Sequence, residues 1–155
     1  MGTALHPHTA QLSPPVRDYG DTRAEFHALL SGCGVYDLSW RVKISLTGSD
    51  RVRWLNGMVT NNVRDLAAGL GVYAFLLNAQ GRIQADLYAF NRGESLLVDV
   101  ERSQRDKVLQ LFDHYIIADD VEVADISDKL TAIGLTGPES PSACRRCPRP
   151  QHRPR

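Results

Sequence analysis

Residues 71–90 read GVYAFLLNAQGRIQADLYAF and predict a β-hairpin, in which a short polar turn joins two strands. From Arg82 onward apolar and polar residues alternate, as they do in a strand with two different faces. The apolar face is suited to a core and holds Ile83, Ala85, Leu87 and Ala89, and the other face holds Gln84, Asp86, Tyr88 and Phe90. A carboxylate between aromatic rings is typical of a ligand cavity. Strands also expose single acids and aromatic residues, so the spacing alone leaves both interpretations open.

The flanking segments predict helices packed against antiparallel strands. Strands are expected at residues 42–47, 95–100, 121–124 and 130–135, helices at about 22–30, after residue 50 and after residue 103, and a loop at 60–71. Ser49 or Asp50 is a suitable N-cap for the second helix, and Ser103 with Asp106 resembles a capping box for the third. This order predicts an α+β fold, with helices packed on an antiparallel or mixed sheet, rather than a parallel doubly wound sheet.

Composition narrows the class of protein. The 155 residues are 43% hydrophobic and 23% charged, which is ordinary for a globular domain. Residues 1–137 hold 13 Lys and Arg against 17 Asp and Glu, which argues against a nucleic-acid-binding surface. No apolar run approaches the ~20 residues that span a bilayer, and no secretory signal pattern is present. The three cysteines do not form a disulfide framework, so we expect a cytoplasmic protein that binds neither membrane nor nucleic acid.

The chain divides into three segments. Residues 1–17 are expected to form a flexible arm, and residues 18–137 a domain that is incomplete. Residues 138–155 contain five Pro, five Arg and no Leu, Ile, Val, Phe, Tyr or Trp, so we expect a disordered tail. A frameshift is the preferred explanation for this abrupt change, and a genuine Arg-rich tail is the other. His6 with His8, and Cys144 with Cys147, supply only parts of a metal site, so none is predicted.

Several motifs occur in a characteristic order. Before the hairpin stand YGD at 19–21, GVYDLS at 34–39, LTGSD at 46–50 and WLNGMVTNNV at 54–63. The hairpin itself adds Leu77-Asn78 and Gly81-Arg82, and VEV at 121–123 and LTGP at 135–138 follow it. The series resembles the N-terminal part of the folate-binding superfamily of the glycine-cleavage T-protein (aminomethyltransferase) and YgfZ-type proteins. The resemblance covers about residues 17–138.

This resemblance implies a fold and a set of site residues. Members fold into several α+β lobes around a cavity that takes tetrahydrofolate or a derivative of it. The position of Asp86 matches the family's catalytic acid near the folate nitrogen. Tyr73, Tyr88 and Phe90 match cavity positions, where rings can stack on a flat pterin. Asn61 matches a residue of the cavity wall, and a purely turn-stabilising role for it is an equal alternative.

Two departures affect the choice of subfamily. The T-protein usually has Gly-Gly at the turn and two consecutive acids on the strand, whereas this chain has Gly81-Arg82 and Ala85-Asp86. The main hypothesis is therefore a truncated tetrahydrofolate-binding protein resembling YgfZ, which serves iron–sulfur proteins. The alternative is an aminomethyltransferase that takes its aminomethyl group from lipoylated H-protein, and a second alternative is a non-enzymatic interaction module. We expect the chain alone to be inactive.

Overall fold

The computed structural model describes residues 18–146 and divides into two compact units. Within the described residues, unit 1 comprises residues 39–131, and unit 2 combines residues 18–38 with residues 132–146. The expected arm, residues 1–17, and residues 147–155 lie outside the described part of the chain.

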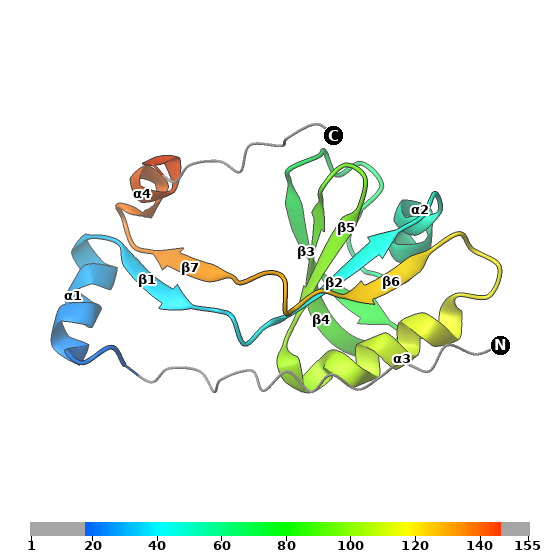
Figure 1. The fold of residues 1–155 in the computed structure, drawn as a ribbon, viewed down its shortest axis with the longest axis horizontal. Coiled ribbons are helices and arrows are strands. Elements are labelled where there is room, and N and C mark those ends of the chain that lie inside the picture. The colour runs from blue at the N-terminus through cyan, green and yellow to red at the C-terminus, as the bar shows by residue number, and fades with distance from the viewer. Residues whose placement is uncertain (1–17, 147–155) are drawn as a thin grey trace. The chain divides into compact units, whose positions relative to one another are not determined.

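Unit 1 is built on a five-stranded antiparallel sheet (Figure 1). Its strands are β2 (Val42–Thr47), β3 (Gly71–Leu77), β4 (Ile83–Asn91), β5 (Leu96–Val100) and β6 (Glu122–Asp125). Their order across the sheet is β3-β4-β5-β2-β6, and each pair of neighbours runs antiparallel. The α+β class and the hairpin at residues 71–90 are confirmed.

Two helices cover the apolar face of this sheet, α2 (Arg51–Asn56) and α3 (Arg105–Tyr115). Helix α3 presents Val108 and Phe112, four residues apart, on one side. The Phe112 ring meets Trp54 of α2 edge to face, with ring centroids 5.1 Å apart. These side chains and the alternate residues of β2 to β5 form the core, which includes Ile44, Leu46, Leu55, Leu76, Ala85, Leu87, Ala89, Leu96 and Val98. Ile83, predicted on the core face, is 60% exposed because it lies at the start of β4, beside a β-bulge at Leu76/Leu77.

The helix starts differ in part from the sequence prediction. Asp50 occupies the N-cap position of α2, but its carboxylate accepts the backbone N–H of Asp120 (3.0 Å) instead of capping the helix. The capping box at Ser103 is wrong. A short 3₁₀ turn, η1 (Arg102–Gln104), precedes α3, and the side chain of Glu101 accepts the N–H of Ser103 (2.8 Å). Ser103 therefore lies inside the first turn rather than at its cap.

The outer edge of β3 is covered by residues 58–61. The backbone N–H of Leu77 donates to Met58 O (2.8 Å), and that of Thr60 donates to Phe75 O (3.0 Å). The Thr60 hydroxyl accepts the N–H of Phe75 (3.0 Å). This segment holds β3 in place from outside, and only its residues 60 and 61 belong to the expected loop, because α2 already ends at Asn56.

Unit 2 contains α1 (Thr22–Ser31), β1 (Gly34–Asp37), β7 (Ile133–Thr136) and α4 (Ser140–Arg146). Helix α1 begins where the Asp21 carboxylate accepts the N–H groups of Arg23 and Ala24, both at 3.0 Å. Strands β1 and β7 pair antiparallel, and Tyr36 lies over Gly134, its cross-strand partner. An added Cβ at Gly134 would stand 2.1 Å from that ring, so a residue without a side chain is needed there.

The expectation of disorder from residue 138 onward is wrong for Ser140–Arg146, which forms α4. Composition counted the prolines against structure, but Pro141 lies in the first turn of the helix, where no N–H is required. The carbonyl of Glu139 accepts the N–H of Ala143 (3.0 Å) and begins the helix. In the described part of the chain, no helix is long and apolar enough to cross a membrane.

Candidate functional site

The register of β3 and β4 brings the predicted site residues of the hairpin to one face of the sheet. Tyr73 lies opposite Tyr88, and Phe75 lies opposite Asp86. This face is turned away from the core, since the intervening residues Ala74 and Leu87 are the buried ones. The structure thus brings together Tyr73, Asp86, Tyr88 and Phe90 as predicted.

Four rings form a continuous surface, named here the aromatic face: Tyr73, Phe75, Tyr88 and Phe90. The Tyr73 ring centroid lies 5.4 Å from Phe75 and 5.1 Å from Tyr88. Tyr88 and Phe90 are stacked at 6.2 Å with planes 19° apart. Within unit 1 these rings stay 36% to 44% exposed. Such exposure is unusual for a cluster of large rings and marks a surface that can bind a flat ligand.

The Asp86 carboxylate has a hydrogen-bond donor at each oxygen. The Tyr73 hydroxyl donates to Oδ2 at 3.3 Å, and the side-chain amide of Gln104 donates to Oδ1 at 3.4 Å. Both distances are at the long end of the hydrogen-bond range. A carboxylate offers about four acceptor positions, so two donors leave room for a ligand N–H.

The Tyr73 phenol is kept in its protonated, donating form. Partial desolvation raises the pKa of Tyr73 above its usual 10.0, and the negative charge of Asp86 and the hydrogen bond with it raise the pKa further. Ionisation would place two negative charges side by side, so the phenol donates to Asp86 over the physiological pH range.

Three charged residues lie beside the aromatic face: Asp99 on β5, Lys43 on β2, and Arg41 just before β2. Asp99 lies opposite both Tyr88 and Lys43 in the sheet. Arg41 forms an ion pair with Asp99, and Lys43 Nζ lies 3.7 Å from the same carboxylate. The Arg41 guanidinium also lies over the face of the Tyr88 ring, 5.8 Å from its centroid, and so supports the ring.

The Asn61 side chain contacts the backbone of β3. Its side-chain amide donates to the backbone carbonyl of Tyr73 at 3.1 Å, and thus ties the segment of residues 58–61 to β3. This contact agrees with the turn-stabilising alternative. A place for Asn61 in the wall of a ligand site stays a prediction.

Sequence reasoning missed three residues of the site: Phe75, Arg41 and Gln104. Alternation from Tyr73 would have placed Phe75 on the same face. Arg41 is separated from Asp99 by 58 residues, and Gln104 from Asp86 by 18, so only the sheet register and the path of η1 bring each pair together.

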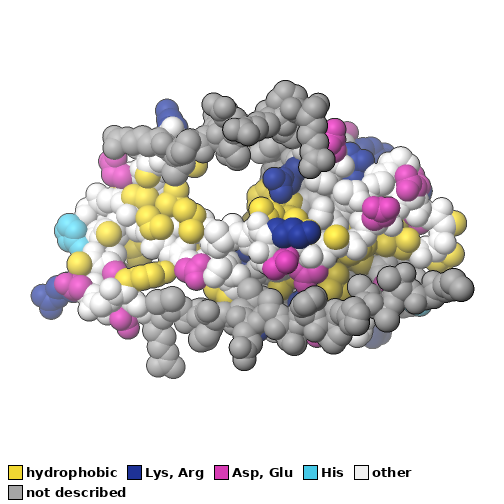
Figure 2. All heavy atoms as spheres, viewed as in Figure 1, with side chains coloured by type: hydrophobic (Ala, Val, Ile, Leu, Met, Phe, Trp, Pro, Cys, Tyr) yellow, Lys and Arg dark blue, Asp and Glu magenta, His cyan; other side chains and the backbone are white. Residues whose placement is uncertain are grey.

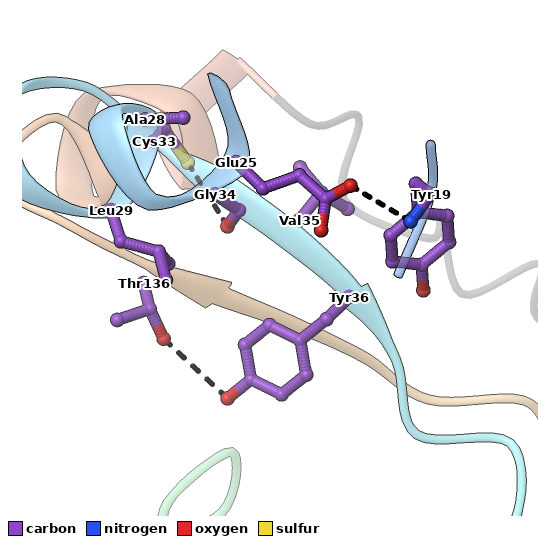
Figure 3. A pocket seen from close by; sticks show the side chains of 9 residues that line it. All are labelled: Tyr19, Glu25, Ala28, Leu29, Cys33, Gly34, Val35, Tyr36 and Thr136. Atoms are coloured by element: carbon purple, nitrogen blue, oxygen red, sulfur yellow. Dashed lines mark hydrogen bonds between the residues drawn. The ribbon is translucent and has the colours of Figure 1, made fainter. Parts of the chain in front are cut away.

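A hollow of about 450 Å³ lies in unit 2 (Figure 3). It is lined by side chains of α1 and β1 with Tyr19 and Thr136, and it is mainly apolar. None of the predicted site residues lines it. The aromatic face and Asp86 therefore remain the candidate site.

Comparison with known families gives one match that covers most of the chain. The family described as the GCVT N-terminal domain matches residues 14–150.

Curated relatives described as aminomethyltransferases match the chain. The protein from Rubrobacter xylanophilus is 31% identical over 122 residues, which cover 79% of this chain and 33% of the relative. The protein from Clostridium botulinum (strain Loch Maree / Type A3) is 33% identical over 118 residues, covering 74% of this chain and 31% of the relative. The chain thus spans about a third of the length of these curated relatives.

A solved structure shows the same fold. The crystal structure of glycine cleavage system aminomethyltransferase T from Bartonella henselae superposes with a TM-score of 0.69 at 18% sequence identity. The match covers 79% of this chain and 34% of that chain.

Proposed function

Because this chain belongs to the GCVT N-terminal domain family, we propose that its aromatic face is one wall of a tetrahydrofolate site. The observation that supports this most is the Asp86 carboxylate, held between two donors at the border of four exposed rings. The proposed reaction of the whole protein is aminomethyl transfer from lipoylated H-protein to the folate.

The residues present fit such a ligand. A pterin is flat and carries N–H groups, so it needs a planar apolar surface and a hydrogen-bond acceptor at its rim. The aromatic face supplies the first, and the free acceptor positions of Asp86 supply the second. The bound folate contributes the nitrogen to which the one-carbon unit is attached.

The chain's own groups have separate roles in this proposal. Asp86 accepts a hydrogen bond from the folate N–H and takes up a proton at a carboxylate oxygen as that nitrogen reacts. Tyr73 donates to Oδ2 and keeps the carboxylate in one orientation. Tyr88 and Phe90 support the ring system, and Arg41 supports Tyr88 in turn.

The two subfamily hypotheses are not equally supported. The relatives named above are described as aminomethyltransferases, as is the solved structure with the same fold. The aminomethyltransferase interpretation, given above as the alternative, therefore has better support than the YgfZ-type one. A role in iron–sulfur protein maintenance has no specific support here.

Titration of the 155-residue chain with tetrahydrofolate tests the binding proposal. We expect Asp86→Asn to abolish measurable affinity by calorimetry, because the amide presents an N–H₂ group where the ligand needs an acceptor. Asp113→Asn is the matched control, since Asp113 is an exposed acid on α3, outside the aromatic face. Equal affinity of the Asp86→Asn and wild-type chains would overturn the role of Asp86.

A chimaera tests the reaction. In it, the matching third of the Rubrobacter xylanophilus aminomethyltransferase is replaced by residues of this chain. We expect the chimaera to form methylenetetrahydrofolate from aminomethylated H-protein, and its Asp86→Asn form to be inactive. A folded chimaera that binds tetrahydrofolate without any transfer would contradict the aminomethyltransferase proposal while leaving folate binding intact.

A further inference from the structure

Gln104 completes the backbone hydrogen bonding of β4 where its neighbouring strand has ended. The β4–β5 ladder has Leu87 opposite Val100 as its terminal pair, and β5 ends at Val100. The next residue of β4, Asp86, therefore has no strand partner on that side. The side-chain Oε1 of Gln104 accepts the Asp86 N–H at 3.3 Å. This side-chain oxygen thus takes the place of the backbone carbonyl that a neighbouring strand would supply.

The other half of the same amide contacts the carboxylate. Gln104 Nε2 donates to Asp86 Oδ1 at 3.4 Å, while Tyr73 donates to Oδ2 from β3. One side chain thus fixes both the backbone and the carboxylate of Asp86. Such hydrogen bonds are often long in ligand-free proteins and shorten when the ligand binds.

We propose that Gln104 is a positioning residue, which sets the direction in which the Asp86 carboxylate faces a ligand on the aromatic face. The ligand in this statement rests on the proposed folate site. The orientation of Asp86 by Gln104 is a separate claim, and it can be measured without any ligand.

The junction of η1 and α3 has a second anchor that makes Gln104 suitable for substitution. Lys107 Nζ donates to the carbonyl of Gln84 at 2.7 Å and attaches α3 to β4 independently of Gln104. Val108 and Phe112 hold the helix to the core. Replacement of Gln104 is therefore expected to leave the fold intact.

Two substitutions separate the two halves of the amide. Gln104→Met has a similar length and loses both contacts. Gln104→Glu keeps an oxygen for the Asp86 N–H but replaces the donor to Oδ1 with a second carboxylate. Gln110→Met and Gln110→Glu are matched controls, because Gln110 is exposed on α3, the helix that follows Gln104.

The first measurement needs no ligand and uses the Tyr73 phenol as a reporter. Its titration is followed by carbon NMR of ring-labelled tyrosine and assigned with Tyr73→Phe. Since Asp86 contributes to the raised pKa of Tyr73, we expect Gln104→Met to move that pKa down toward its usual value. An unchanged Tyr73 titration in a folded Gln104→Met chain would overturn the proposal.

The second measurement is tetrahydrofolate affinity. We expect Gln104→Met and Gln104→Glu to weaken binding about tenfold, the loss expected for one hydrogen bond to a charged group. The Gln110 controls should bind as wild type. Wild-type affinity in the Gln104→Glu chain would overturn the role in ligand positioning. A shifted Tyr73 titration in a chain that binds no folate would support Gln104 and overturn the folate site instead.

Discussion

Units 1 and 2 both have regular helices and strands, but within residues 18–146 the buried apolar side chains all belong to unit 1. In unit 2 most of the large apolar residues stay exposed, among them Phe26 (61%), Leu30 (64%) and Val35 (58%). Figure 2 shows such side chains gathered at the surface of unit 2. A buried Leu or Phe contributes roughly 1.5–3 kcal/mol. The difference shows that local signals, such as the Asp21 cap and the β1–β7 pairing, specify elements without supplying a core.

Amide hydrogen exchange should separate the two units most strongly. We expect the amides of β2 and β5 to exchange only through global unfolding, since both strands are central and their inward side chains are buried. Amides of β1 and β7 should exchange at least about a hundredfold faster, because little apolar burial opposes their opening. Equal protection of the amides in β1 and β5, measured on the whole chain by NMR, would show that unit 2 is as stable as unit 1.

A matched pair of truncations should show the next largest effect. Phe112→Ala is expected to lower the free energy of unfolding by about 3–5 kcal/mol, because it empties a fully buried site against Trp54. Leu29→Ala in unit 2 should cost less than about 1 kcal/mol, since Leu29 is 40% exposed. Urea denaturation followed by far-UV circular dichroism, which reports the helices and strands of both units, measures both losses. Similar losses in the two variants would show that unit 2 shares the core.

The hydrogen bonds and the ion pair of Asp125 should make the stability of unit 1 depend on pH. Burial alone would raise the pKa of Asp125, but hydrogen bonds from Ser127 and Arg105 outweigh it and lower the pKa below its usual 3.8. The stabilisation is therefore present above pH 4 and disappears as pH falls through the lowered pKa.

We expect Asp125→Asn to cost about 1 kcal/mol at neutral pH, after allowance for solvent screening, and progressively less as the pH falls below the usual pKa of 3.8. Urea midpoints across this range provide the measurement. A constant loss at all pH values would mean that Asp125 acts through packing rather than charge.

The smallest effect is expected for two equally exposed isoleucines. Ile133 of unit 2 is 59% exposed and Ile83 of unit 1 is 60% exposed. Replacement of either by Thr should change the unfolding free energy by less than about 0.5 kcal/mol. Ile133→Thr should also reduce self-association in sedimentation velocity, because Ile133 belongs to the exposed apolar surface of unit 2. A clear loss of stability from Ile133→Thr alone would indicate a hidden core in unit 2.

Period-two patterning carried most of what the sequence could predict. It placed β2 at Val42–Thr47 and put Asp86, Tyr88 and Phe90 on the face away from the core. The pattern did not predict burial correctly where the neighbouring strand determines whether a side chain is covered. Ile83 follows the apolar pattern but lies beside a bulge at the strand end, and so it is exposed.

The helical segments show the same division. The helix expected after residue 103 is α3, and its apolar residues Val108 and Phe112, four positions apart, are both buried. The helix expected at about residues 22–30 is α1, which has Phe26, Leu29 and Leu30 on one side. All three are exposed, because apolar spacing alone does not determine what covers a helix. The contact of Gln104 with Asp86 depends on where β5 ends relative to β4, which spacing in the sequence does not encode.

The segment of residues 58–61 along β3 limits how unit 1 can associate. Many proteins recruit a partner by adding a strand to an open sheet border, and the same border can seed aggregation. Backbone groups of Phe75 and Leu77 are already engaged by Met58 and Thr60, so an incoming strand finds them occupied. At the opposite border β6 has four residues and carries acids at both ends, Glu122 and Asp125, which disfavour strand addition. Unit 1 is therefore protected against sheet polymerisation, and its aromatic face can stay uncovered without that hazard.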